Sequence, residues 1–142
     1  MEGLLDQVAD REYTTSELEL LWQAGNRVGD DELGHGAHVA SIAAGSARVA
    51  HEGIAPGSRL LLVKTNFQET GDAVEWVFRK AKDKPTVVNL SFGDHRGAHD
   101  GTEKDQRLHQ KLAGPGKLIV ASAATTASAG FTSVMSLTRS GN

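Results

Sequence analysis

The 142-residue sequence contains no cysteine. This absence excludes disulfide frameworks, cysteine nucleophiles and thiolate metal sites. Long apolar runs are missing too, because no stretch approaches the roughly 18 residues that a membrane span needs. The start, MEGLLDQVADREY, carries acidic residues where a signal peptide has a basic segment and an apolar one. The sequence therefore predicts no membrane contact, and it assigns no cellular compartment.

An excess of either charge is also missing. Fifteen Lys and Arg residues face 18 Asp and Glu residues, for a formal net charge of −3. Such a chain offers no basic field for a phosphate backbone, so nucleic acid is not an expected partner. Hydrophobic residues make up 39% and charged residues 23%, which is ordinary for a globular protein. The length is typical of a single domain over residues 1–142.

Hydrophobic periodicity predicts alternating strands and helices. Continuous apolar runs at 59–64, 86–90 and 117–122 are typical of strands buried on both faces of a parallel sheet. Helical patterns cover part of 11–24, with Thr15 or Ser16 as the cap, and also 35–45, 70–82 and 102–112. The small residues of the second helix suit close packing on all sides. This alternation favours an α/β fold, whereas 125–142 follows no period and is predicted to be poorly ordered.

The main chemical signal is His35, which lies between Gly34 and Gly36 just before the small-residue helix. The two glycines allow a substrate to approach the imidazole closely. A neutral imidazole can accept a proton, as a general base must. On its own, a histidine flanked by glycines is more often structural, so its surroundings decide the interpretation.

Those surroundings resemble the subtilisin-like (S8 family) serine peptidases. Their histidine motif, D-x-x-G-H-G-T-H-V-A-G-I-x-A-G, is matched by Asp31, Gly34, His35, Gly36, His38, Val39, Ala40, Ile42, Ala44 and Gly45, with departures at Ala37 and Ser41. Segments 53–64, 87–93 and 118–124 are similar to three further family motifs, in the family's order. The resemblance covers about residues 11–125 and leaves 126–142 outside. It implies a three-layer αβα fold with a parallel sheet, here incomplete.

The resemblance also implies roles for matched residues. His35 would be the general base for a serine nucleophile. Ser91, Phe92 and Gly93 would pair with an extended polypeptide substrate. Thr125 stands where the family has its oxyanion-hole asparagine, and its hydroxyl has a shorter reach. Calcium often accompanies the family, but no acidic cluster here forms a convincing cage, so no cofactor or metal is assigned.

Two members of the expected triad are not recognisable. The orienting aspartate usually lies in a V-x-D-[ST]-G strand, whereas Asp6 and Asp10 lie in polar, non-strand surroundings and Asp31 matches a non-catalytic position. The nucleophile motif G-T-S-M-A-x-P is also missing. Its nearest mimic, 130–135, contains Ser133, which we interpret as a serine in a flexible tail. We therefore expect a fragment that is inactive alone and self-associates through exposed sheet edges.

Two other interpretations remain open. The first is a non-catalytic, peptidase-derived fragment that binds extended peptide. The second is a zinc site built from His35 and His38 together with His95, His99 and Asp100, although the helix lacks the glutamate of H-E-x-x-H. Neither of the chain's glycine-rich segments completes a phosphate-binding motif, so a nucleotide site is not predicted.

Overall fold

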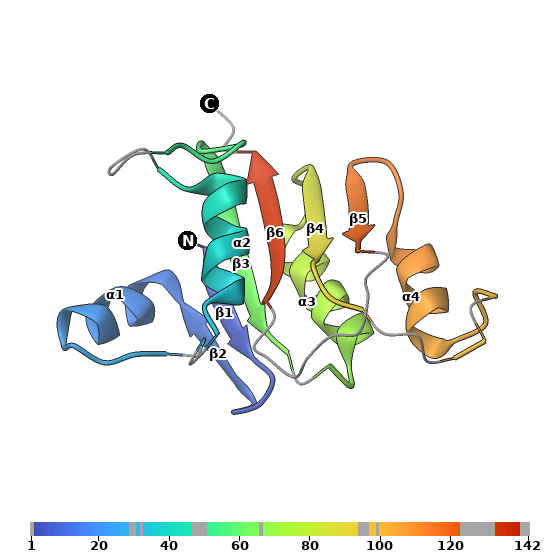
Figure 1. Ribbon diagram of the computed structural model, residues 1–142, viewed down its shortest axis with the longest axis horizontal. Coiled ribbons are helices and arrows are strands. Elements are labelled where there is room, and N and C mark those ends of the chain that lie inside the picture. The colour runs from blue at the N-terminus through green and yellow to red at the C-terminus, as the bar shows by residue number, and fades with distance from the viewer. Residues whose placement is uncertain are drawn as a thin grey trace.

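The computed structural model describes residues 2–28, 31, 33–46, 51–65, 67–93, 97–98 and 100–122, and the backbone of 133–139. These residues form one six-stranded sheet with strand order β2-β1-β3-β6-β4-β5 (Figure 1). The strands are β1 (Gly3–Asp6), β2 (Arg11–Thr14), β3 (Ser58–Lys64), β4 (Thr86–Leu90), β5 (Lys117–Ala121) and β6 (Ser133–Arg139). The helices are α1 (Thr15–Gln23), α2 (His35–Ala44), α3 (Thr70–Ala81) and α4 (Lys104–Leu112).

The sheet lies between two helical layers. In Figure 1, α2 crosses in front of the sheet and α3 lies behind it, in contact with α4. Burial along β4 alternates accordingly, because Thr86, Val88 and Leu90 are buried on the α3 side while Val87 and Asn89 are only half-buried on the α2 side. The pairs β1–β3 and β4–β5 are parallel. The incomplete α/β fold with parallel strand pairs is therefore confirmed, although the sheet also contains antiparallel pairs.

The hydrophobic core lies between α3 and the sheet. Its fully buried side chains are Val63, Val74, Val77 and Val88. Trp76 of α3 is 3% exposed, and its Nε1 donates a hydrogen bond to Glu12 Oε2 at 3.0 Å. Hydrogen bonds from Lys80 and Trp76 lower the pKa of Glu12. This polar cluster attaches the β1–β2 hairpin to α3.

The structure corrects the prediction at both ends of the chain. Residues 3–6 form β1, so Asp6 ends a strand instead of lying in non-strand surroundings. Residues 133–139, predicted to be poorly ordered, form β6, which pairs antiparallel with both β3 and β4. A strand between two others can satisfy its backbone groups on both edges, and this gain is independent of side-chain periodicity. Residues 125–132 and 140–142 lie outside the described part of the chain.

Two helix predictions also need correction. The cap of α1 is Thr14, one residue before the expected position, and it forms a capping box with Glu17. In α2 only Gly36 is buried and Ile42 is 55% exposed, so the expected packing on all sides is wrong. One face of α2 contacts β3 and β6, and the space over β4 remains open. None of the described helices is long and apolar enough to cross a membrane.

Candidate active site around His35

The start of α2 is set by a glycine and an aspartate. Gly34 adopts a left-handed conformation with φ of 67°, which glycine tolerates without steric cost. The Asp31 Oδ2 atom accepts a hydrogen bond of 2.7 Å from the backbone N–H of Ala37, the third helical residue. Asp31 thus caps the helix from outside, because Gly34 has no side chain to do so. As a result, His35 becomes the first residue of α2 and its side chain is exposed.

The His35 ring contacts the segment that follows β4. Its Nε2 lies 3.1 Å from the carbonyl oxygen of Ser91, 56 residues away in sequence. A carbonyl oxygen only accepts hydrogen bonds, so Nε2 is the donor and carries the proton. In the neutral ring, the lone pair then lies on Nδ1. The histidine and the predicted substrate-pairing segment are therefore neighbours, at the carboxyl end of β4.

Side-chain contacts hold the segment 91–93 in place, but the segment is not fully buried. All three residues are half-buried. The Phe92 ring meets Phe67 edge-on, with ring centroids 5.2 Å apart. The side chain of Asn89 donates a hydrogen bond to Ser91 Oγ at 2.7 Å, so this polar residue of an apolar strand has an internal partner. These contacts position the backbone of Ser91, and the segment still faces solvent in part.

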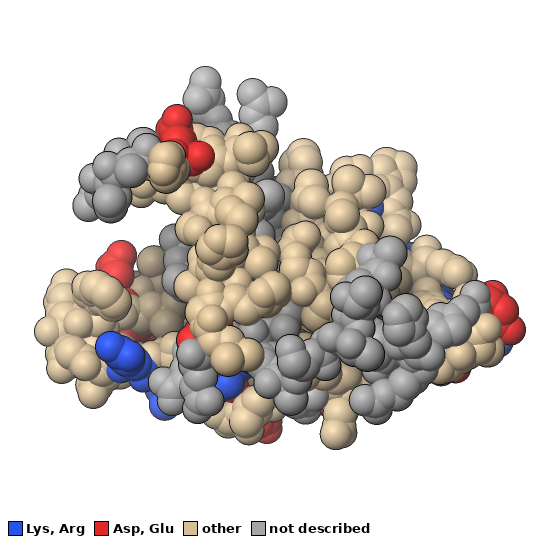
Figure 2. Space-filling view, in the orientation of Figure 1, with Lys and Arg blue, Asp and Glu red and all other residues tan. Residues whose placement is uncertain are grey.

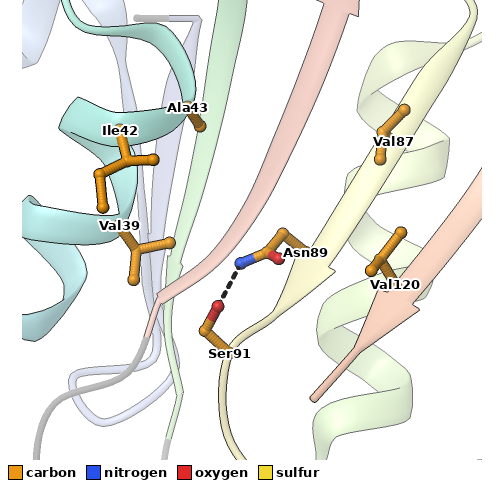
Figure 3. A pocket seen from close by; sticks show the side chains of 7 residues that line it. All are labelled: Val39, Ile42, Ala43, Val87, Asn89, Ser91 and Val120. Carbon is orange, nitrogen blue, oxygen red and sulfur yellow. Dashed lines mark hydrogen bonds between the residues drawn. The ribbon is translucent and has the colours of Figure 1, made fainter. Parts of the chain in front are cut away.

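A groove of about 300 Å³ runs beside this contact, between α2 and the sheet (Figure 3). Val39, Ile42 and Ala43 of α2 form one wall, while the other wall and the floor come from Val87, Asn89, Ser91 and Val120. The lining is apolar except for Asn89 and Ser91, whose side chains are hydrogen-bonded to each other. The groove can therefore take an apolar side chain next to the backbone of Ser91.

Asp6 is the strand-end carboxylate that sequence reasoning missed. It is 5% exposed, and its Oδ1 accepts hydrogen bonds of 3.0 Å from the N–H groups of Val8 and Ala9. Lys64 Nζ lies 3.8 Å from Oδ2. These contacts hold the turn between β1 and β2, and account for the buried charge. The available signal was local: the apolar pair Leu4-Leu5 directly precedes the aspartate.

Ser133 also lies elsewhere than expected. It begins β6, and its register partner is Lys64, which in turn pairs with Asp6. The next residue of β6, Val134, pairs with Leu90, the residue before Ser91. The backbone of Ser133 therefore lies at the same height along the strands as that of Ser91, at the carboxyl end of β4. Sequence reasoning missed this juxtaposition because it depends on pairing between distant strands.

The other predicted positions are only partly described. Thr125, His95 and His99 lie outside the described residues. Among the residues that are described, no group of three or more His, Asp or Glu side chains gathers as a metal site would require. The zinc interpretation therefore gains no support from His35, His38 and Asp100.

Comparison with known proteins agrees with the motifs. No solved structure matched the chain. The family model described as the subtilase family matches residues 7–136, which include α2, β4 and the contact between His35 and Ser91. Because this match covers most of the 142 residues, the chain belongs to the subtilase family of serine peptidases.

Proposed function

We propose that this chain forms part of a peptide-hydrolysing site in which His35 is the general base and Ser91, Phe92 and Gly93 hold an extended polypeptide. The observation that carries the proposal is the 3.1 Å contact between His35 Nε2 and the Ser91 carbonyl. It links an exposed imidazole to backbone that continues a strand, which is where an extended peptide can add. Membership of the subtilase family supports a peptidase-like function.

The tautomer of His35 determines how the site can act. A base that accepts a proton from a serine hydroxyl needs a free nitrogen lone pair directed at that hydroxyl. Here Nε2 carries the proton that binds Ser91, and Nδ1 holds the lone pair. For Nε2 to act as the base, its contact with Ser91 must break and the proton must reside on Nδ1. A substrate N–H that donates to the Ser91 carbonyl displaces the ring, so substrate binding and release of the histidine are coupled.

Hydrolysis also needs a nucleophile and a group that orients the imidazole. Asp6, the buried carboxylate at the carboxyl end of β1, already accepts hydrogen bonds from the backbone of its own turn. The predicted oxyanion donor, Thr125, has a shorter reach than asparagine. We therefore propose that this chain alone binds extended peptide without hydrolysing it at a measurable rate. The alternative is a non-catalytic fragment in which His35 takes no part in the site. It predicts the same peptide binding but no competition between the peptide and the His35 ring.

An NMR titration tests the proposal. The ¹⁵N-labelled chain is titrated with a capped pentapeptide of alternating alanine and leucine. We expect shifts in the amide signals of residues 91–93, and loss of the Nε2–H signature of His35 as peptide binds. His35→Ala should bind at least as tightly, because the competing donor is gone. His38→Ala is the matched control, one turn along the same helix, and should behave like the unmodified chain.

Two results would contradict the proposal. Unchanged signals of residues 91–93 at millimolar peptide would refute the binding site. Peptide binding without any change in the His35 ring would favour the binding-only alternative. A fluorophosphonate probe tests inactivity separately, and we expect no serine to be labelled. Labelling of Ser133 would overturn that expectation and identify a nucleophile level with Ser91.

A further inference from the structure

Phe67, in the connection between β3 and α3, has an unfavourable backbone conformation. Its φ is 65°, in the left-handed region that glycine enters freely but that a residue with a bulky side chain rarely adopts. Asp10 and Lys82 also have positive φ, but Asp10 has the short polar side chain that tolerates this region and Lys82 is the C-cap of α3. Strain of this kind persists where the surrounding structure fixes the residue, and it is often found at functional sites.

Two contacts hold Phe67 in this conformation. Its backbone N–H donates a hydrogen bond of 3.0 Å to Oγ1 of Thr65, a buried residue. Its ring meets the Phe92 ring edge-on, with the centroids 5.2 Å apart and an angle of 80° between the ring planes. Such a pair is favourable beyond the burial of its surface. Phe67 remains 39% exposed, whereas Phe92 packs against the hydrophobic core. Incomplete burial alone therefore does not account for the strain at Phe67.

The position of Phe92 fixes the direction of the Ser91 carbonyl. This carbonyl and the N–H of Phe92 belong to one planar peptide unit, which ends at the Cα atom of Phe92. A rotation of Phe92 therefore turns the carbonyl away from His35 Nε2, which lies 3.1 Å from its oxygen. At the other end of the unit, the side chain of Asn89 holds Ser91 Oγ. The contacts made by Asn89 and Phe67 thus act on the two ends of the same peptide unit.

We propose that Phe67 is a positioning residue for peptide binding. Its ring restrains Phe92 and so directs the Ser91 carbonyl towards the N–H of an incoming peptide, and this contact offsets the unfavourable φ. The inference rests on the proposed function, in which the segment 91–93 pairs with extended peptide. If Phe67 only stabilised its loop, peptide binding and chain stability would change together. In the positioning role, peptide binding follows the aromatic ring, whereas stability also follows the backbone conformation.

Three substitutions at Phe67 separate the ring from the backbone. Phe67→Ala removes the ring and keeps a Cβ atom at positive φ, whereas Phe67→Gly removes the ring and relieves the strain. In both variants the peptide Kd should rise about 3- to 10-fold, the range that corresponds to one edge-to-face aromatic pair. Phe67→Tyr keeps the ring and should keep the Kd. The Tm of Phe67→Gly should exceed that of Phe67→Ala, the reverse of the usual order of glycine and alanine.

The Kd is measured by NMR titration with the capped alanine–leucine pentapeptide, in the His35→Ala background where no imidazole competes for the Ser91 carbonyl. Figure 2 shows that the visible surface over α2 and the upper part of β4 is almost entirely uncharged. This neutral peptide therefore reports on the segment 91–93 and not on electrostatic attraction. Lys82→Gly is the matched control, because it relieves a positive φ at the end of α3. It should raise the Tm and leave the Kd unchanged.

The unbound chain supplies a second readout, with His35 in place. Loss of the Phe67 ring should weaken the Nε2–H signature of His35, because the Ser91 carbonyl is no longer held in one direction. The ring signals of His38 should not change. A role confined to the stability of the loop would leave both histidine signals as they are in the unmodified chain.

Three outcomes would overturn the inference. The first is the same peptide Kd with and without the Phe67 ring. The second is a Tm of Phe67→Gly that does not exceed that of Phe67→Ala, which would show that φ is not strained. The third is an unchanged Nε2–H signature of His35 in Phe67→Ala. Absence of peptide binding at residues 91–93 in the chain with Phe67 intact would instead refute the proposed function, and the His35 signature of the unbound chain would still decide whether Phe67 positions the Ser91 carbonyl.

Discussion

Removal of the Asp31 carboxylate should loosen the start of α2 and the presentation of His35. The N–H groups of the first helical turn lack intrahelical partners, and in α2 no side chain of the cap residue supplies one. Asp31 does so at 2.7 Å, with a charge that also complements the positive end of the helix. Its second oxygen, Oδ1, is buried without a hydrogen-bond partner among the described residues. A substitution of Asp31 by alanine therefore removes one hydrogen bond and one charge at the start of the helix.

The two contributions can be separated by comparing Asp31→Ala with Asp31→Asn. Loss of a capping side chain costs about 1 kcal/mol, and loss of the charge near a helix end costs about 0.5 kcal/mol. Asp31→Ala should therefore lower the free energy of unfolding by about 1.5 kcal/mol, equivalent to roughly 3–6 °C in Tm for a chain of this length. Asp31→Asn keeps an acceptor oxygen and should lose only about 0.5 kcal/mol.

Urea denaturation followed by circular dichroism measures both variants. Asp83→Ala, at an exposed turn residue, is the control and should stay within about 0.5 kcal/mol of the unmodified chain. The ¹⁵N signals of the His35 ring supply a local readout, because fraying of the first turn weakens the Nε2 contact with Ser91. If Asp31→Asn destabilises as much as Asp31→Ala, or if neither differs from the control, the capping argument is refuted.

Three further predictions concern stability. Partial burial raises the pKa of Glu2, but hydrogen bonds and charge from Arg59 and Lys84 outweigh this and lower it below 4.5. The stabilisation is therefore present above pH 4.5 and is lost as pH falls through the lowered pKa, so Glu2→Gln should flatten the decline in unfolding free energy on acidification. An unchanged acid slope would contradict this. Gly71→Ala brings a Cβ to 2.7 Å from Leu108 Cδ2 of α4, the tip of a side chain that can shift. The strain and the gain in helix propensity should therefore leave the free energy of unfolding within about 1 kcal/mol of the unmodified chain; a second substitution, Leu108→Ala, should give a non-additive effect, and simple additivity would refute the clash. Val88→Ala empties a fully buried site and should cost about 2 kcal/mol in urea denaturation, and a loss below 0.5 kcal/mol would show that the core collapses around it.

Sequence patterns located the elements whose information is local. The strand predicted at 86–90 coincides with β4, and the helix predicted at 70–82 matches α3 to within one residue. The apolar residues of α3 recur at helical spacing over its whole length, with acidic and basic residues at its expected ends. The strand was predicted from a continuous apolar run. The motif from Asp31 to Gly36 likewise predicted that His35 lies at the start of a helix, and His35 is the first residue of α2. These features depend on neighbours within a few residues.

Other features depend on which segments pair. Four residues at 3–6 are too short for a period, yet β1 is buried because it lies between β2 and β3. Nothing in the composition of 133–139 indicates that this segment inserts between β3 and β4. The small residues of α2 suggested a helix buried all round, but only one layer contacts it, and the groove over β4 follows from that.

By itself, the amino-acid sequence determined the family and the alternation of strands and helices, and it predicted His35 as the residue for proton transfer. Only the tertiary structure decided that this imidazole contacts the Ser91 carbonyl and that Asp6 accepts hydrogen bonds from its own turn. The physical reason is the separation along the chain over which each kind of interaction acts. Periodicity and capping act over one or two turns of chain, whereas strand order and register bring together groups more than 50 residues apart.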